Sequence, residues 1–234
     1  MRKALFCSVF VSALASQSFA YFQDFQAGGA LPEWSSVSYL DGNSVTRAGV
    51  RTLGRFADNA STTLTLTGLS AGAYTLSFRL YTIGSWDGQG PLAGPDIFGV
   101  KQDGVTFFQE TFNNVSTNGG SVPYEPYTSQ GQSFGGQGAP VGTYLARTGM
   151  TGFNGLDLGQ FSWDVDAKDT YYDLTFNLNL SSSTLALNFF GNNLQDATDE
   201  SWSLDNVRVT AVPEPGSLAA LAAGALLLAR KRRA

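Results

Sequence analysis

Residues 171–180, Tyr-Tyr-Asp-Leu-Thr-Phe-Asn-Leu-Asn-Leu, constrain the fold of this chain more than any other stretch. Apolar and polar residues alternate here one by one. Successive side chains of a β-strand point to opposite faces, so this pattern predicts a strand with one buried and one hydrated face. The residues expected on the buried face are Tyr172, Leu174, Phe176, Leu178 and Leu180.

Three pairs of strands are expected from the same alternation. The first joins 171–180 to 185–189 through three serines, and the second spans 61–81 with a turn at 68–72. The third spans 97–108, where Asp103-Gly104 is a typical two-residue hairpin turn. The sequence therefore predicts antiparallel hairpins and no helical periodicity in the body of the chain.

The last strand, 201–209, changes phase after Leu204, which predicts a β-bulge at Asp205-Asn206. Together these elements predict an all-β fold, an antiparallel two-sheet β-sandwich of jelly-roll-like type. Residues 113–168 interrupt the pattern and are rich in Gly, Ser, Asn and Tyr. They are interpreted either as a platform of functional loops or as a partly disordered segment.

The first 20 residues have the pattern of a secretory signal peptide. Arg2 and Lys3 precede an apolar stretch, and Ser18-Phe19-Ala20 is a small-x-small cleavage site, so cleavage is expected after Ala20. This predicts export through Sec-type machinery. The only cysteine, Cys7, would be removed with the signal, so the mature protein is expected to have no disulfide.

The C-terminal residues 212–234 form a second unit with its own composition. Pro213 and Pro215 keep the chain extended, and the apolar stretch 217–229 predicts a short hydrophobic helix. That helix would span roughly 20 Å, less than the ~30 Å hydrocarbon core of a bilayer. With a cytoplasmic basic cluster behind it, it is interpreted as a membrane-retention segment that holds the chain transiently. The cluster consists of Arg230, Lys231, Arg232 and Arg233.

Val212-Pro213-Glu214-Pro215, followed by this helix and the basic cluster, resembles the PEP-CTERM sorting signal of Gram-negative bacteria. The same tail is also known as the ice-binding protein C-terminal domain, a name that does not imply ice binding. The resemblance implies processing by a membrane-embedded exosortase and export toward the cell surface, with exopolysaccharide or biofilm as the setting.

Charge and composition exclude several classes of function for the body of the chain. Residues 21–211 contain 18 acidic and 8 basic residues, which does not suit binding to nucleic acid. The chain has no histidine, so a Ser-His-Asp triad and the usual zinc sites are excluded. Carboxylate pairs such as Asp164/Asp166 or Asp199/Glu200 leave a glycoside hydrolase only as a distant alternative. The protein is therefore predicted not to be an enzyme.

Four acidic residues lie in loops or at strand ends and are candidate ligands of a structural calcium ion: Asp87, Asp96, Glu200 and Asp205. Calcium takes six to eight oxygen ligands, and carboxylates on flexible, Gly-rich backbone supply them. The sequence indicates no other cofactor. The alternatives are hydrated acids in ordinary turns and a buried cluster of arginines with carboxylates.

Five short motifs are similar to an extracellular jelly-roll module of bacterial surface proteins: Leu-Gly-Arg-Phe (53–56), Gly-Ser-Trp-Asp-Gly (84–88), Gly-Pro-Asp-Ile-Phe (94–98), Ala-Arg-Thr-Gly (146–149) and 199–207. The resemblance covers about 22–209. It implies a shared site around Asp87, Asp96 and Glu200, with Arg55 or Arg147 as counter-ions.

Aromatic residues raise carbohydrate binding as an alternative function. Trp86 lies in a Gly-rich loop, and Tyr124 and Tyr127 lie in the long 113–168 stretch, where they could stack on sugars. The competing interpretation is core packing, which is expected for Trp202 beside Leu204.

The sequence therefore predicts three parts: a signal peptide (1–20), a β-sandwich (21–211) and a sorting tail (212–234). The expected function is that of an exported structural or adhesive protein of the cell surface or extracellular matrix. A carbohydrate-binding module, stabilised by calcium, is the alternative.

Overall fold

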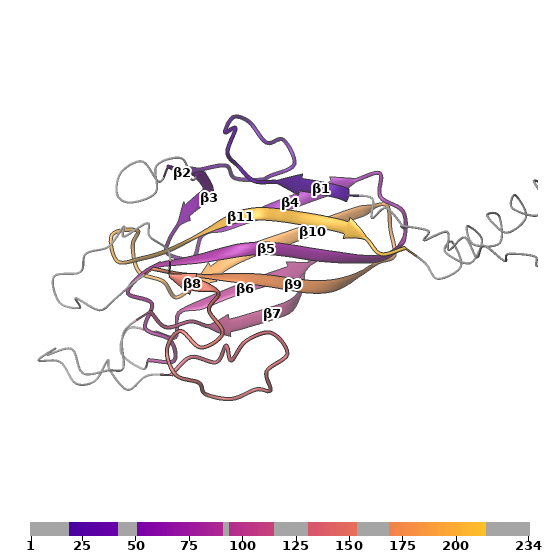
Figure 1. Ribbon diagram of the computed structural model, residues 1–234. Helices are drawn as coiled ribbons and strands as arrows, with labels where there is room; N and C mark the ends of the chain where they lie inside the picture. The colour runs from indigo at the N-terminus through magenta and orange to yellow at the C-terminus, as the bar shows by residue number, and fades with distance from the viewer. Residues whose placement is uncertain (1–18, 42–50, 91–93, 115–130, 154–168, 214–234) are drawn as a thin grey trace, which may run out of the picture.

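The computed structural model describes residues 19–41, 51–90, 94–114, 131–153 and 169–213. Within these ranges every regular element is a β-strand, and the strands form two antiparallel sheets that face each other (Figure 1). Over the same ranges, no helix is long and apolar enough to cross a membrane. The hydrophobic helix expected within 217–229 lies outside the described residues.

The larger sheet has the order β2-β3-β11-β5-β9-β8, and β1 pairs with β11 beside β3. Its strands are β1 (Phe19–Gln23), β2 (Tyr39–Asp41), β3 (Arg51–Phe56), β5 (Gly72–Gly84), β8 (Gly152–Phe153), β9 (Thr170–Leu180) and β11 (Glu200–Ala211). The longest strands, β5, β9 and β11, therefore lie side by side, with β11 inside the sheet.

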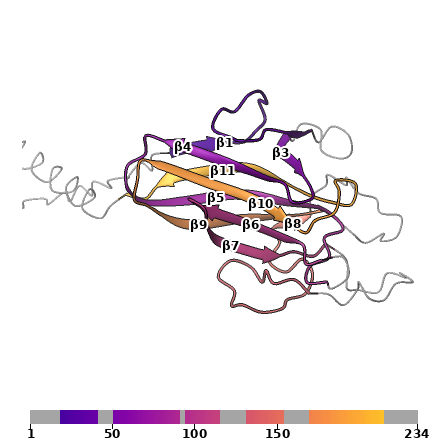
Figure 2. The same ribbon diagram turned by 180° about the vertical axis from the view of Figure 1, so that it is seen from behind.

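The smaller sheet has the order β4-β10-β6-β7 and is seen from its own side in Figure 2. Its strands are β4 (Ser61–Thr67), β6 (Ile97–Gln102), β7 (Val105–Thr111) and β10 (Thr184–Asn192). The antiparallel two-sheet sandwich predicted from the alternation is thus confirmed, and it fits a jelly-roll-like module.

The core lies between the sheets and is built from the alternate residues that the sequence assigns to it. In β9, Tyr172, Leu174, Leu178 and Leu180 are buried, whereas Asp173 and Thr175 are exposed. Aromatic rings join the sheets, for example Phe98 with Trp202, whose ring centroids are 5.2 Å apart. Burial of such side chains is the main favourable contribution to folding.

Two of the three expected hairpins are wrong. β9 belongs to the larger sheet and β10 to the smaller one, and the same is true of β5 and β4. The serines 181–183 and the turn 68–72 therefore connect the two sheets. Alternation marks which residues face the core, but both a hairpin and a connection between facing sheets satisfy it.

The third hairpin and the bulge are confirmed. β6 and β7 pair around Asp103-Gly104, and both turn residues have positive φ, as a two-residue hairpin turn of this kind requires. In β11 the register with β5 shifts between Asp205 and Arg208, with Asn206 at φ 51°. The bulge keeps Leu204 and Val207 both in the core.

Candidate functional site

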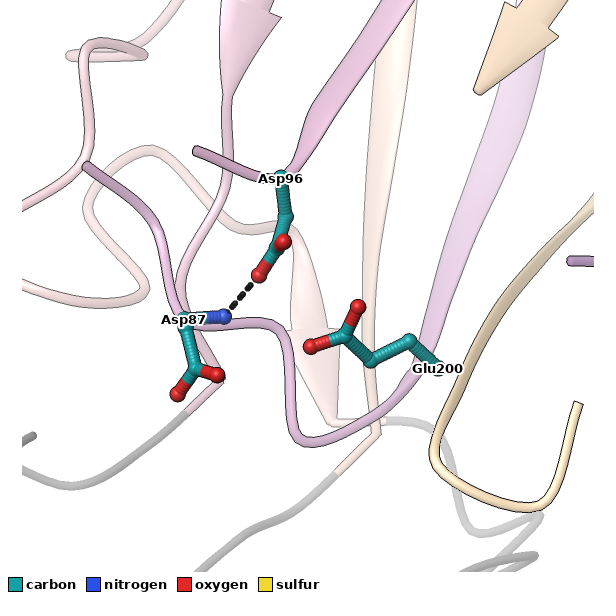
Figure 3. Close-up of side chains that lie close together, drawn as sticks. All are labelled: Asp87, Asp96 and Glu200. Carbon is teal, nitrogen blue, oxygen red and sulfur yellow. Dashed lines mark hydrogen bonds between the residues drawn. The ribbon is translucent and has the colours of Figure 1, made fainter. Parts of the chain in front are cut away.

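Three buried carboxylates from separate segments of the chain lie close together at one end of the sandwich. In Figure 3 the carboxylates of Asp96 and Glu200 point toward the same space, and that of Asp87 points away from it. Asp87 lies in the loop after β5, Asp96 directly precedes β6, and Glu200 begins β11. One carboxylate oxygen from each lies within 4.8 Å of the other two. The three residues are 4%, 0% and 0% exposed, respectively. The site therefore joins the larger sheet to the smaller one.

Strand pairing and one tight turn bring these residues together. Glu200 pairs with Gly84, which places it at the end of β5, and the amide of Asp96 donates to the carbonyl of Gly88 at 3.0 Å. Gly88 has φ 67°, and a Cβ there would approach the carbonyl oxygen of Gly131 to 2.4 Å. Only glycine fits this turn.

The carboxylates of Asp96 and Glu200 each have one oxygen that accepts a hydrogen bond from a backbone N–H and a second oxygen that does not. The amide of Asp87 donates to Oδ2 of Asp96, and the amide of Gln195 donates to Oε2 of Glu200 at 3.1 Å. The other oxygens, Asp96 Oδ1 and Glu200 Oε1, are buried and have no hydrogen-bond partner among the described residues. Within the same residues, no lysine or arginine forms an ion pair with Asp96 or Glu200.

The electrostatics of the site disfavour ionised carboxylates in the absence of a cation. Burial raises the pKa of Asp96, and the charge of Asp87 adds to the rise. Burial likewise raises the pKa of Glu200, followed by the charge of Asp96. Desolvation and a like charge both favour the neutral form of a carboxyl group. The cluster can therefore either hold protons or bind a cation through oxygen ligands.

Arg55 and Arg147, suggested as counter-ions, contact other polar groups. Arg55 donates from Nε to Ser201 Oγ at 2.9 Å, and the acids that act on its pKa are Asp169 and Asp196. Burial nevertheless lowers the pKa of Arg55. The guanidinium of Arg147 donates to the backbone carbonyl of Asn114.

Asp205, the fourth predicted metal ligand, is not part of the cluster. Its side chain accepts hydrogen bonds from the backbone amide of Asn206 at 2.7 Å and from its side-chain amide at 2.9 Å. It lies opposite Arg79 in β5. The prediction of four converging acids is therefore wrong at this residue, because Asp205 caps the β11 bulge.

Trp86 is not available for stacking on a sugar. Its side chain is fully buried, and its indole N–H donates to the carbonyl of Ser201 at 2.9 Å. The prediction that Trp86 contributes to a glycan-binding surface is therefore wrong, because its indole ring packs into the core at the end of the sheet. Trp202 is buried as expected, and Tyr124 and Tyr127 lie outside the described residues.

Asn114 supports the site, although the sequence interpretation did not single it out. Its side-chain amide donates to the carbonyls of Thr82 at 3.0 Å and Gly84 at 2.9 Å, and its Oδ1 accepts from the hydroxyl of Thr170 at 2.8 Å. It thereby fixes the end of β5 from which the Asp87 loop departs. The available signal was the pair Asn113-Asn114 directly after an apolar strand.

The sorting motif begins where β11 ends. The amide of Val212 donates to the carbonyl of Ala73 at 2.9 Å, and Pro213 is the last described residue. Outside the described residues lie Glu214, Pro215, Arg230, Lys231, Arg232 and Arg233. Near the N-terminus of the chain, the expected cleavage site after Ala20 falls within β1, so cleavage would leave Tyr21 to Gln23 paired with β11.

Residues 211–233 match the family model of the PEP-CTERM protein-sorting motif. No curated protein matches the sequence of the chain. The PEP-CTERM resemblance inferred from Val212 to Pro215 and the basic cluster is therefore confirmed for the tail.

Several solved structures resemble the chain at low identity. The GH115 4-O-methyl-alpha-glucuronidase BtGH115A is 12% identical, over 91% of this chain and 20% of that one, with a TM-score of 0.38. The CBM35 of Paenibacillus barcinonensis is 13% identical, over 82% of this chain and 99% of that one, with a TM-score of 0.32. The K3 adhesin domain of Lys-gingipain from Porphyromonas gingivalis is 15% identical, over 83% of this chain and 100% of that one, with a TM-score of 0.34. This chain thus spans about a fifth of the glucuronidase, and similarity at this level carries no conclusion about activity or ligand.

Proposed function

We propose that this chain, which carries a PEP-CTERM protein-sorting motif at 211–233, is an exported structural or adhesive module of the cell surface or extracellular matrix. The match of the tail is the observation that carries the proposal. The motif implies recognition by export machinery and an exosortase. In the proposed sequence of events, residues 217–229 hold the precursor in the inner membrane until processing.

The strand pairing supports this role. β1 and β11 are antiparallel neighbours, with Phe19 opposite Thr210. The expected signal peptide and the sorting tail, here called the two sorting sequences, therefore join the sandwich at the same end. Glu200 begins β11 and the motif follows its last residue, so the acidic cluster lies at the opposite end. A chain held through its tail would present that far end, with its loops, away from the membrane.

The proposed role does not include catalysis. A glycoside hydrolase needs two carboxyl groups that flank a bond of the substrate. Asp96 and Glu200 lie close together, but both are fully buried, which supports a role without catalysis. Carbohydrate binding loses its best candidate residue with the burial of Trp86.

Fractionation of the producing cells tests the proposal. The full-length chain is expected in the envelope or on the surface, and a variant that ends at residue 211 is expected in the medium or periplasm. Replacement of Pro213, Glu214 and Pro215 by alanine is expected to leave a longer, unprocessed form in the membrane fraction. An immunoblot with antiserum against the sandwich measures both size and location.

Alanine replacement of Gln109, an exposed residue of β7, is the control and should not change the distribution. If the truncated and triple-alanine variants fractionate and migrate like the parent, the tail does not direct sorting and the proposed function is wrong. Retention of the surface protein on the cells' own polysaccharide would instead support the carbohydrate-binding alternative.

A further inference from the structure

We propose that Asp87, Asp96 and Glu200 form a binding site for one calcium ion, which links the two sheets at the end of the sandwich opposite the sorting tail. This inference goes beyond the proposed function, because sorting depends on the tail and the ion on the body. Failure of one experiment therefore leaves the other intact.

The spacing of the oxygens fits a single ion. Calcium–oxygen distances are about 2.3–2.6 Å, so two ligands of one ion lie no more than about 5 Å apart. The three carboxylates each offer an oxygen within 4.8 Å of the others. Acidic side chains that merely share a surface would separate to reduce their repulsion. Here, three separate backbone segments hold them together.

The orientation of the carboxylates provides a second, independent observation. Backbone amides hold Asp96 Oδ2 and Glu200 Oε2, and the remaining oxygens are fully buried without a hydrogen-bond partner among the described residues. In Figure 3, the carboxylates of Asp96 and Glu200 point toward the same space. A buried oxygen with no donor destabilises the folded state. Coordination to a cation would satisfy both oxygens at once.

Protonation is the competing way to satisfy the site, because a proton on Asp96 or Glu200 would have the other carboxylate as its acceptor. The amides of Asp87 and Gln195, however, already bind the second oxygens as they would bind charged groups. A divalent ion removes the mutual repulsion of the carboxylates and leaves them ionised.

Ligand chemistry selects calcium. The donors are carboxylate oxygens, which suit hard cations, and the chain has no histidine to favour zinc or copper. Magnesium requires nearly ideal octahedral geometry and keeps several waters. Sites in extracellular modules bind calcium with dissociation constants of roughly 10⁻⁴–10⁻³ M, the range expected here.

The first experiment measures the melting temperature of the exported protein, purified from its producing cells, in EDTA and then with added CaCl₂. At about 100 times the dissociation constant, calcium is expected to raise the melting temperature by about 5–10 °C. An equal concentration of MgCl₂ should raise it less. Elemental analysis after dialysis against CaCl₂ should find one calcium per chain.

The variant Glu200→Gln keeps the size of the side chain and an acceptor for the amide of Gln195. It should lose the calcium-dependent shift, while its melting temperature in EDTA should equal or exceed that of the parent, because one source of repulsion is gone. A variant that merely misfolds would melt lower in EDTA. Asp96→Asn is the second variant, with the same expected loss of the shift.

Asp58→Asn is the matched control. Like Glu200→Gln, it removes one carboxylate, but this one lies at an exposed position. Asn tolerates the positive φ of 53° at this position. This control should keep the full shift. The proposal is overturned if the parent binds no calcium and shows no shift, or if Asp58→Asn loses the shift as completely as Glu200→Gln does.

Discussion

Asp205 illustrates how a single buried carboxyl group couples this fold to pH. Its side chain is 5% exposed, and burial raises its pKa to about 6 from an ordinary value of 3.8. Three charged groups in nearby segments act on this pKa. Arg79 of β5 lowers the pKa, whereas Asp24 after β1 and Asp173 of β9 raise it. The folded state therefore binds the proton of Asp205 more tightly than the unfolded chain does.

The variant Asp205→Asn tests this coupling. Because the folded-state pKa is raised, the parent loses stability as the pH rises from about 4 through about 6, where the group must ionise while buried. Asparagine does not ionise. The free energy of unfolding of the variant, relative to the parent, should therefore rise by about 1–2 kcal/mol between pH 4 and pH 7, allowing for solvent screening.

Urea denaturation at several pH values measures this difference, and Asp58→Asn serves again as the exposed control. Other groups that titrate in this range contribute equally to parent and variant, so they cancel. A relative stability that stays constant between pH 4 and pH 7 would show that Asp205 ionises as freely in the folded protein as in the unfolded chain.

Trp86 and Asp87 are sequence neighbours for which the sequence predicted different roles. The Gly-rich loop indicated an exposed, sugar-stacking Trp86 and a candidate calcium ligand at Asp87. The structure buries both, because Trp86 fills the end of the core and carries Asp87 inward with it. The sequence singled out Asp87, Asp96 and Glu200, and the structure places their carboxylates close together. The sequence could not show that Asp205, five residues after Glu200, would be drawn into a bulge beside Arg79 instead.

At the scale of elements, Gln132 holds the segment 131–150 against the sandwich. Its buried side-chain amide donates to the carbonyls of Phe134 at 2.6 Å and Thr148 at 2.9 Å. Its Oε1 accepts from the amides of Asn113 at 3.1 Å and Arg147 at 2.9 Å. One side chain thus connects the end of β7 to a loop that has little regular structure of its own.

Gln132→Ala should lower the free energy of unfolding by about 2–3 kcal/mol, because it leaves buried backbone groups without partners. Gln109→Ala, at an exposed position of β7, should change it by less than about 0.5 kcal/mol. Urea denaturation compares the two. Equal effects of both substitutions would mean that water replaces the lost bonds and that the segment is only loosely attached.

The long strands were predictable, but their partners were not. In β9 and β10, strict alternation identified the buried residues correctly except for Phe176, which is only partly buried, since each strand has one face in the core. Whether two consecutive strands pair in one sheet depends on the direction in which the chain leaves the turn between them. The three serines at 181–183 contain no residue pair that determines this direction. Asp103-Gly104 does fix it, and that hairpin was correct. Short strands such as β8, with two residues, have no pattern to detect.

For the whole molecule, the pairing of β1 with β11 sets the polarity of the sandwich. Both sorting sequences join one end, and β11 runs the length of the larger sheet from Glu200 to Ala211. At about 3.3 Å per residue, the acidic cluster lies roughly 35–40 Å from the start of the motif. A precursor held by its tail should therefore expose the cluster end more than the tail end.

Single cysteines can measure this polarity, because the only native cysteine, Cys7, lies in the expected signal peptide. Thr198→Cys places a thiol at the cluster end, and Ser182→Cys places one in the turn between β9 and β10, near the tail. Both positions are exposed.

In the membrane-held form with Pro213, Glu214 and Pro215 replaced, a bulky maleimide should react several-fold faster at position 198 than at 182. In the chain that ends at residue 211, where no membrane is near, the two rates should become similar. A ratio that is the same in both forms would mean that the tail does not hold this end of the sandwich against the bilayer.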